Sequence, residues 1–335
     1  MRNTGIIITM AYPETIVMVA DEWYSPFLRF IHIGKKNYLR AGHAALVLID
    51  KQKGDLEYHD FGRYITAIPN GRVRGAKYDA ELNFPIKAIV RNGEIKNLEE
   101  ILLFLASNSH LTHGDGKMIV SVCSAVNYDL AKQYIVKMQR KGGIRYAAFV
   151  KNASNCARFV TDALIASVTQ QKIKKALQKS KQFTPSTVGN VVLAASDKKV
   201  YEVTMENGIK AFTSSSSKET RKYFLDRLPN HRMNFIGTLE AKKVVGLDEK
   251  AQWLSGIASG AWYEFTQKKG LAINEFRFRR ISPHGTVDID AVFVSNDGFV
   301  LSDSFEIIHN SNCLFCTVKQ HDKIKVLNYR RLYLS

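Results

Sequence analysis

The chain has 335 residues, 45% of them hydrophobic and 24% charged, a composition typical of a globular protein with room for two domains. No uninterrupted apolar stretch approaches the roughly 18 residues that a membrane span needs, and residues 1–10 lack the long apolar core and cleavage site of a signal peptide. We therefore expect a cytoplasmic protein without a membrane span. The formal net charge of +17 leaves nucleic acid open as a partner, although no nucleic-acid-binding signature accompanies it.

Strands and helices alternate along residues 1–190, which we expect to form the first domain. Residues 5–10 and 15–20 predict strands, and residues 42–50 and 55–64 predict the two arms of a β-hairpin. Helices are predicted further along this part of the chain by apolar periodicity and by favourable capping residues. Their ranges are 97–107, 127–140, 156–167 and 170–180.

The remainder of the chain differs in pattern. Residues 191–244 predict a connecting segment with a short hairpin, its strands at 191–195 and 200–203. Residues 245–335 predict a small β-rich C-terminal domain of unknown role, with a helix at 248–260 and then short strands between turn signals. The predicted fold class is therefore α+β, with an antiparallel sheet, packed helices and a small, mostly β C-terminal domain.

Cys156 stands at the start of one predicted helix. Ser154 and Asn155 before it are favourable N-cap residues, and the apolar residues after it fall on one helical face. A helix N-terminus stabilises a thiolate through its dipole and its unpaired N–H groups, and those groups can also stabilise an oxyanion. The position suits a nucleophile, although a cysteine at a helix start is more often structural.

His43 is the only strongly polar residue in an apolar run. Such a histidine is commonly a core residue, and a functional role needs a partner such as a thiol. If residues 50 and 55 pair across a four-residue turn, Asp60 lies on the face of His43, where its carboxylate could orient the imidazole. If the turn holds an odd number of residues, the register slips by one and His59 takes that place. The four-residue turn favours Asp60.

The order of these residues resembles that of a known protein family. A histidine lies on one strand, a polar residue on the next, and a cysteine opens a later helix. The motifs are Gly42-His43-Ala44 and Asn155-Cys156-Ala157-Arg158-Phe159-Val160. They are similar to those of the permuted NlpC-type papain-like cysteine hydrolases, including the lecithin:retinol acyltransferase group, in which the histidine precedes the cysteine. The resemblance covers residues 30–170. It implies a papain-like fold, with Cys156 as nucleophile, His43 as base and the polar residue of the second strand as orienter.

The resemblance also implies cleavage or transfer at an amide or ester carbonyl. Arg63, Tyr64 and Arg72 follow the hairpin and are candidates for substrate binding, since a guanidinium can bind a carboxylate through two hydrogen bonds. The structural alternative is that Arg63 pairs with a nearby acid such as Asp79 or Glu81. We expect a thiol hydrolase acting on a small peptide-like amide or ester. The alternative is a non-catalytic ligand- or nucleic-acid-binding protein on a hydrolase scaffold.

Cys313 and Cys316 form one Cys-x-x-Cys pair, with His309 and His321 nearby. These residue types suit zinc, but a strong zinc signal would carry a second, closely spaced pair of ligands. Two thiols packed on a β-strand are the alternative. No cofactor and no metal are predicted, and binding of a metal by these two cysteines stays open.

Overall fold

The computed structural model describes residues 2–20, 22–35, 37–229, 239–242, 244–257 and 259–334. The chain forms two compact units, Met1–Gly62 with Phe84–Arg232, and Arg63–Asn83 with Met233–Ser335. The predicted α+β class is confirmed: the first unit mixes helices with an antiparallel sheet, and the second is mostly β. The domains expected from the sequence, residues 1–190, 191–244 and 245–335, are consecutive segments of the chain, and this division stays a prediction. In space, the short segment Arg63–Asn83 belongs with the C-terminal residues.

The first unit is built on an antiparallel sheet whose strands run in the order β5-β4-β1-β9-β11-β12. The strands are β1 (Gly5–Tyr12), β4 (His43–Asp50), β5 (Leu56–Gly62), β9 (Met118–Val126), β11 (Val200–Thr204) and β12 (Gly208–Ala211). Strands β1 and β4 pair along their whole length and are buried on both faces, except for the last residue of β4. They form the centre of the hydrophobic core, which explains why their sequences are almost continuously apolar.

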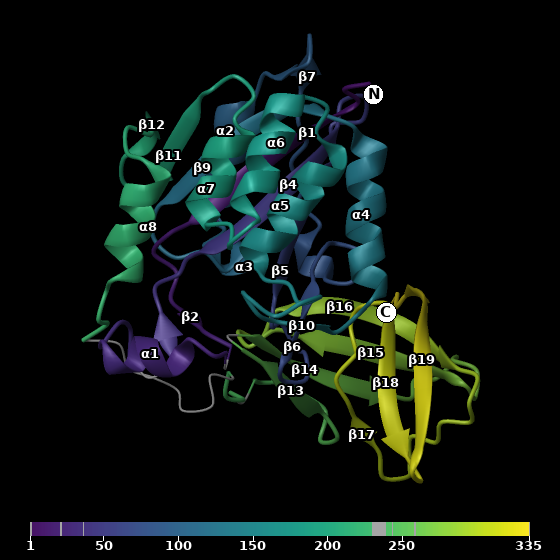
Figure 1. Cartoon of the computed structure of the whole chain (residues 1–335). Helices are drawn as coiled ribbons and strands as arrows, with labels where there is room; N and C mark the ends of the chain where they lie inside the picture. The colour runs from purple at the N-terminus through teal and green to yellow at the C-terminus, as the bar shows by residue number, and fades with distance from the viewer. Residues whose placement is uncertain are drawn as a thin grey trace. The chain divides into compact units, whose positions relative to one another are not determined.

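Several helices of the first unit pack on this sheet and on one another (Figure 1). The helices are α1 (Ser25–Phe30), α2 (Leu98–Ser107), α3 (Ser109–Thr112), α4 (Tyr128–Arg140), α5 (Cys156–Ser167), α6 (Gln171–Ser180), α7 (Thr187–Ala194) and α8 (Ser216–Phe224). Helices α4, α5 and α7 contact the sheet directly, and α6 packs on α5 and α7. The four helices predicted from periodicity are confirmed as α2, α4, α5 and α6.

One sequence prediction in the first unit is wrong, and a second is right only in part. Residues 191–195, predicted as a strand, belong mostly to α7, where the Ser186 hydroxyl accepts a hydrogen bond from the Gly189 amide at 2.9 Å and caps the helix. Val188 and Val191 of α7 pack against the sheet, so burial outweighs the strand preference of β-branched residues. The hairpin is instead β11–β12. The strand predicted at 15–20 is reduced to β2 (Val17–Met18), which pairs with β3 (Tyr38–Leu39).

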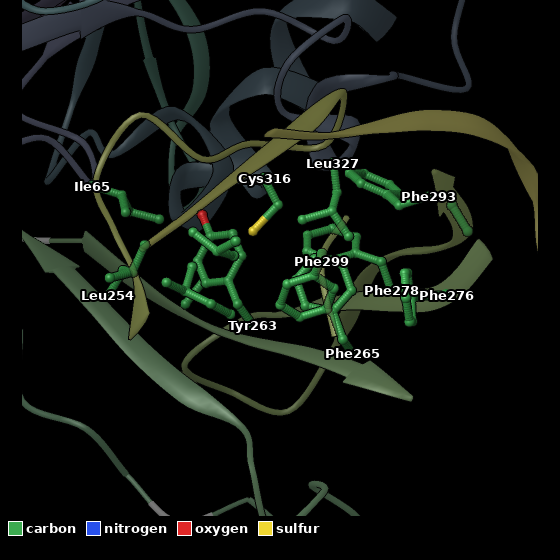
Figure 2. Packing of buried hydrophobic residues seen from close by; sticks show 14 residues of the cluster. Ile65, Leu254, Tyr263, Phe265, Phe276, Phe278, Phe293, Phe299, Cys316 and Leu327 are labelled. Atoms are coloured by element: carbon green, nitrogen blue, oxygen red, sulfur yellow. The ribbon is translucent and has the colours of Figure 1, made fainter. Parts of the chain in front are cut away.

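The second unit contains a seven-stranded antiparallel sheet in the order β13-β14-β15-β16-β19-β18-β17. The strands are β13 (Gln252–Gly256), β14 (Ser259–Thr266), β15 (Glu275–Ile281), β16 (Val287–Ser295), β17 (Glu306–Ile307), β18 (Phe315–Gln320) and β19 (Lys323–Leu332). The Gln252 side chain connects the two edges, donating to the Phe305 carbonyl at 2.9 Å and accepting from the Ile307 amide at 2.7 Å. The sheet therefore curls into a barrel-like form whose interior is largely aromatic (Figure 2).

The helix predicted at residues 248–260 is wrong, because strands β13 and β14 occupy this part of the chain. Trp253 and Trp262 are cross-strand partners whose ring centroids lie 5.5 Å apart. Such aromatic pairs stabilise a sheet, and the pairing depends on a partner strand that local periodicity does not reveal.

Among the residues that the structure describes, none of the helices is both long enough and apolar enough to cross a membrane.

Candidate active site

The first turn of α5 presents Cys156. Asn155 is the N-cap residue, and its side-chain oxygen accepts a hydrogen bond from the Arg158 amide at 2.9 Å, which confirms the predicted cap. The amides of Cys156 and Ala157 precede the first intrahelical hydrogen bonds, so they have no partner within the helix. Cys156 itself is buried but lines a cavity of about 580 Å³. The thiol thus lies where a helix N-terminus favours negative charge.

The β4–β5 hairpin sets the register of His43 and Asp60. Ala45 pairs with Asp60, as a four-residue turn predicts, and His43 Nε2 lies 3.1 Å from Asp60 Oδ2. His59 pairs with Leu46, and its Nε2 lies 3.7 Å from a Glu57 carboxylate oxygen. The register therefore places Asp60, not His59, beside His43, because consecutive side chains of a strand point to opposite faces.

His43 interacts with both Asp60 and Cys156. Burial alone lowers the pKa of a histidine, but hydrogen bonds and charge interactions with Asp60 and Cys156 outweigh that effect and raise the pKa of His43 to about 9. The imidazole is thus held between a carboxylate and a thiol, and it keeps its proton at neutral pH. Such a pairing of thiol, imidazole and carboxylate is the arrangement that activates a cysteine nucleophile.

Tyr58 is a further member of this site that the sequence analysis did not single out. Its hydroxyl lies 3.0 Å from Asp60 Oδ2 and 3.2 Å from the Thr112 carbonyl oxygen. Both Tyr58 and Asp60 are fully buried. The sequence could have identified Tyr58, because this residue lies two positions before Asp60 on the same predicted strand and so faces the same side.

We expect Tyr58→Phe to raise the pKa of His43 further, because the Asp60 carboxylate loses a hydrogen-bond donor and attracts the imidazolium proton more strongly. The free energy of unfolding should also fall by about 1–3 kcal/mol, the cost of a buried acceptor that loses a partner. NMR titration of the His43 ring measures the first effect. Tyr201→Phe, on the partly exposed strand β11, is the matched control. An unchanged His43 titration would contradict the role given to Tyr58.

Arg63, Tyr64 and Arg72 all belong to the second unit. Arg72 forms a two-pronged ion pair with Asp79, and its Nε donates to the Tyr64 carbonyl at 3.0 Å. The Arg74 guanidinium lies 4.0 Å from the centre of the Tyr64 ring. The side chain of Arg72 is therefore held inside its own unit by Asp79, which also lies 3.4 Å from a guanidinium nitrogen of Arg280. A role of these residues in substrate binding stays a prediction.

Cys313 and Cys316 are buried thiols of the second unit. Burial raises the pKa of Cys313 to about 11 and that of Cys316 to about 12. The Cys316 sulfur lies in the aromatic core that Figure 2 shows. Within the described part of the chain, no three metal-ligating side chains gather into a group that could hold an ion.

Comparison with known proteins gives a separate result for each part of the chain. Residues 7–173 match the family model of type VI secretion system effector TseH-like proteins, and residues 251–330 match the model of the DUF6695 C-terminal domain. The crystal structure of the type VI secretion system effector TseH is similar at 16% identity, covering 63% of this chain and 99% of that chain with a TM-score of 0.39. No curated protein shows significant similarity. The segment that holds His43, Asp60 and Cys156 is thus similar to TseH-like effectors.

Proposed function

We propose that this protein is a thiol hydrolase that cleaves an amide or ester bond, with Cys156 as nucleophile, His43 as general base and acid, and Asp60 as the residue that orients His43. The observation that supports this function is the linked set of contacts, in which one imidazole interacts with both Asp60, at 3.1 Å, and Cys156. The position of Cys156 at the start of α5 adds the helix N-terminal amides.

The proposed reaction has two stages. The Cys156 thiolate attacks the substrate carbonyl, a C–S bond forms, and the developing oxyanion is stabilised by the unpaired amides of the first turn of α5. The C–N or C–O bond then breaks while the His43 imidazolium donates its proton to the leaving amine or alcohol. In the second stage His43 accepts a proton from water, which attacks the thioester and releases a carboxylic acid and the thiolate.

One similarity supports this chemistry, and a second bears on where the protein acts. The order of histidine before cysteine agrees with the permuted NlpC-type papain-like hydrolases that the motifs resemble. The match of residues 7–173 to a family named for type VI secretion system effectors favours a protein that acts outside the cell that makes it. That role would differ from the cytoplasmic location that the sequence predicts.

The pH dependence of alkylation by iodoacetamide tests the proposed ion pair. Because the pKa of His43 is raised to about 9, the imidazolium persists from acidic pH up to that value and is lost above it. An imidazolium beside the thiol favours the thiolate that iodoacetamide attacks, so alkylation of Cys156 at pH 7 should be faster in the wild type than in His43→Gln. Because this advantage depends on the imidazolium, it should disappear as the pH rises through about 9.

Peptide mapping by mass spectrometry assigns the label to one cysteine. Cys123, Cys313 and Cys316 serve as internal controls, since burial raises the pKa of each to about 11 or above. A wild-type profile identical to that of His43→Gln would remove the basis for a thiol hydrolase.

A further inference from the structure

The cavity beside Cys156 lies entirely within the first unit. It has a volume of about 580 Å³, within the range of about 300–1,000 Å³ typical of small-molecule sites. Asn155, Cys156 and Ala157 form part of its wall, so the nucleophile and the start of α5 face the same space. A group bound in this cavity would have its reacting carbon next to the thiol.

The cavity wall is mostly apolar. Aliphatic and aromatic side chains from the N-terminal segment, from the loop before α5 and from the segment after α6 form it. Its aromatic residues include Trp23, Tyr24, Phe149 and Phe183. Phe149 connects several of these rings, with its centroid 5.3 Å from that of Tyr24 and 5.0 Å from that of Phe183. Trp23, Tyr24, Phe149 and Phe183 thus form one connected cluster of rings.

Glu22 is the charged side chain among the described residues that line the cavity. Its carboxylate accepts hydrogen bonds from the amides of Ala148 and Phe149, at 2.6 and 2.8 Å. The Glu22 carboxylate therefore stabilises the loop that carries Phe149. Apart from Glu22, the described residues that line the cavity carry no charged side chain, so a charged group placed against this wall would lose its hydration without gaining a salt bridge.

Two aromatic residues of the wall are largely exposed to solvent, Trp23 at 78% and Phe183 at 73%. Large apolar side chains left exposed in a cluster commonly mark a binding site. A ligand that covers them would remove apolar surface from water and gain affinity in proportion to the area buried.

We propose that this cavity binds the apolar acyl chain of the substrate, so that the hydrolase acts on acyl esters or acyl amides. The inference rests on the proposed function of Cys156 and names its substrate class, which differs from the small peptide expected from the sequence. Cys156 Sγ bonds to the acyl carbon, the C–O or C–N bond breaks, and the alcohol or amine leaves with the proton that His43 donates. Water then cleaves the thioester, so the products are the fatty acid and the alcohol or amine.

A series of 4-nitrophenyl esters from acetate to octanoate tests the chain preference, with each ester used below the concentration at which it self-associates. We expect kcat/KM to rise about threefold to fourfold for each added methylene that becomes buried. The intact protein should also hydrolyse octanoyl 4-nitroanilide faster than the acetyl analogue. Equal rates along the series, with hydrolysis that depends on Cys156, would overturn the acyl-chain inference and leave the proposed function standing.

Substitutions at the exposed rim test the position of the chain. Phe183→Ser and Trp23→Ser should each lower the octanoate-to-acetate ratio of kcat/KM by roughly tenfold, because each removes apolar surface from the wall. Met205→Ser is the matched control, since Met205 is 65% exposed in the same unit and does not line the cavity. An unchanged ratio in both rim variants would overturn the inference.

Binding by the Cys156→Ala variant separates the two proposals. Binding of octanoate to this variant, measured by calorimetry, should persist and should weaken about tenfold when Phe183→Ser is added. Absence of octanoate binding overturns the acyl-chain inference, whatever the activity of the wild type. If octanoate binds but the wild type hydrolyses no ester or amide in the series, the proposed hydrolase function fails and the apolar site remains.

Discussion

Cys156→Ala is expected to lower kcat/KM by roughly 10⁴-fold or more for any ester or amide that the wild-type protein hydrolyses. The reason is chemical, because alanine offers no atom that can form the acyl-enzyme bond. The change itself is small, since Cys156 is buried at the first turn of α5 and alanine is a good helix former. Steady-state kinetics with the 4-nitrophenyl esters measure the loss, and circular dichroism checks the fold.

His43→Gln should cause a loss of similar size, and the double variant Cys156→Ala/His43→Gln should be no worse than either single variant. Residues that act as one catalytic unit show such non-additive losses. Asp60→Asn should cost about 10²- to 10⁴-fold, because the amide neither stabilises the imidazolium nor fixes its orientation as the carboxylate does.

Cys123→Ala provides the matched cysteine control. Cys123 lies in β9, is fully buried, and has its pKa raised to about 11 by burial. Its replacement should leave kcat unchanged, with at most a modest loss of stability. Activity retained in Cys156→Ala would show that another group performs the chemistry.

Asp79→Asn is expected to lower the free energy of unfolding of the second unit by about 3–5 kcal/mol. Asp79 is fully buried, accepts two hydrogen bonds from Arg72, and lies 3.4 Å from a guanidinium nitrogen of Arg280. The change would leave these buried cations short of a counter-charge. Calorimetric unfolding should show a fall in Tm on the order of 10 °C.

The effect of Asp79 should depend on pH. Burial alone raises its pKa, but the charges of Arg72 and Arg280 outweigh burial, so its pKa lies below the ordinary value. The stabilisation from this carboxylate is therefore present above its ordinary pKa of about 3.9 and is lost as the pH falls through the lower folded-state value. The difference in Tm between wild type and Asp79→Asn should shrink in strong acid.

Asp322→Asn is the control for Asp79→Asn. Asp322 pairs with Lys319 at 3.3 Å in the same unit, but both side chains are exposed. Exposed pairs contribute at most about 1 kcal/mol, so the Tm should move by only a few degrees. Equal shifts in the two variants would show that the buried network around Asp79 contributes little to stability.

The sequence determined the features that depend on neighbouring residues. Asn155 and the apolar spacing after it were enough to place Cys156 in the first turn of a helix, because capping and periodicity act within a few residues. The length of one turn was enough to place Asp60 beside His43, since a hairpin turn fixes strand register. The roles of these residues in catalysis are proposals that the experiments above test.

The tertiary structure decided the features that join distant parts of the chain. The contact between His43 and Cys156 depends on how α5 packs on the sheet, and the sequence supported it only through a family resemblance. Three other features likewise depend on partners far along the chain. They are the ion pair of Arg280 with Asp79, the helical state of Val191, and the strands β13 and β14. The physical reason is that burial and strand pairing outweigh local propensity wherever a distant surface supplies the contacts.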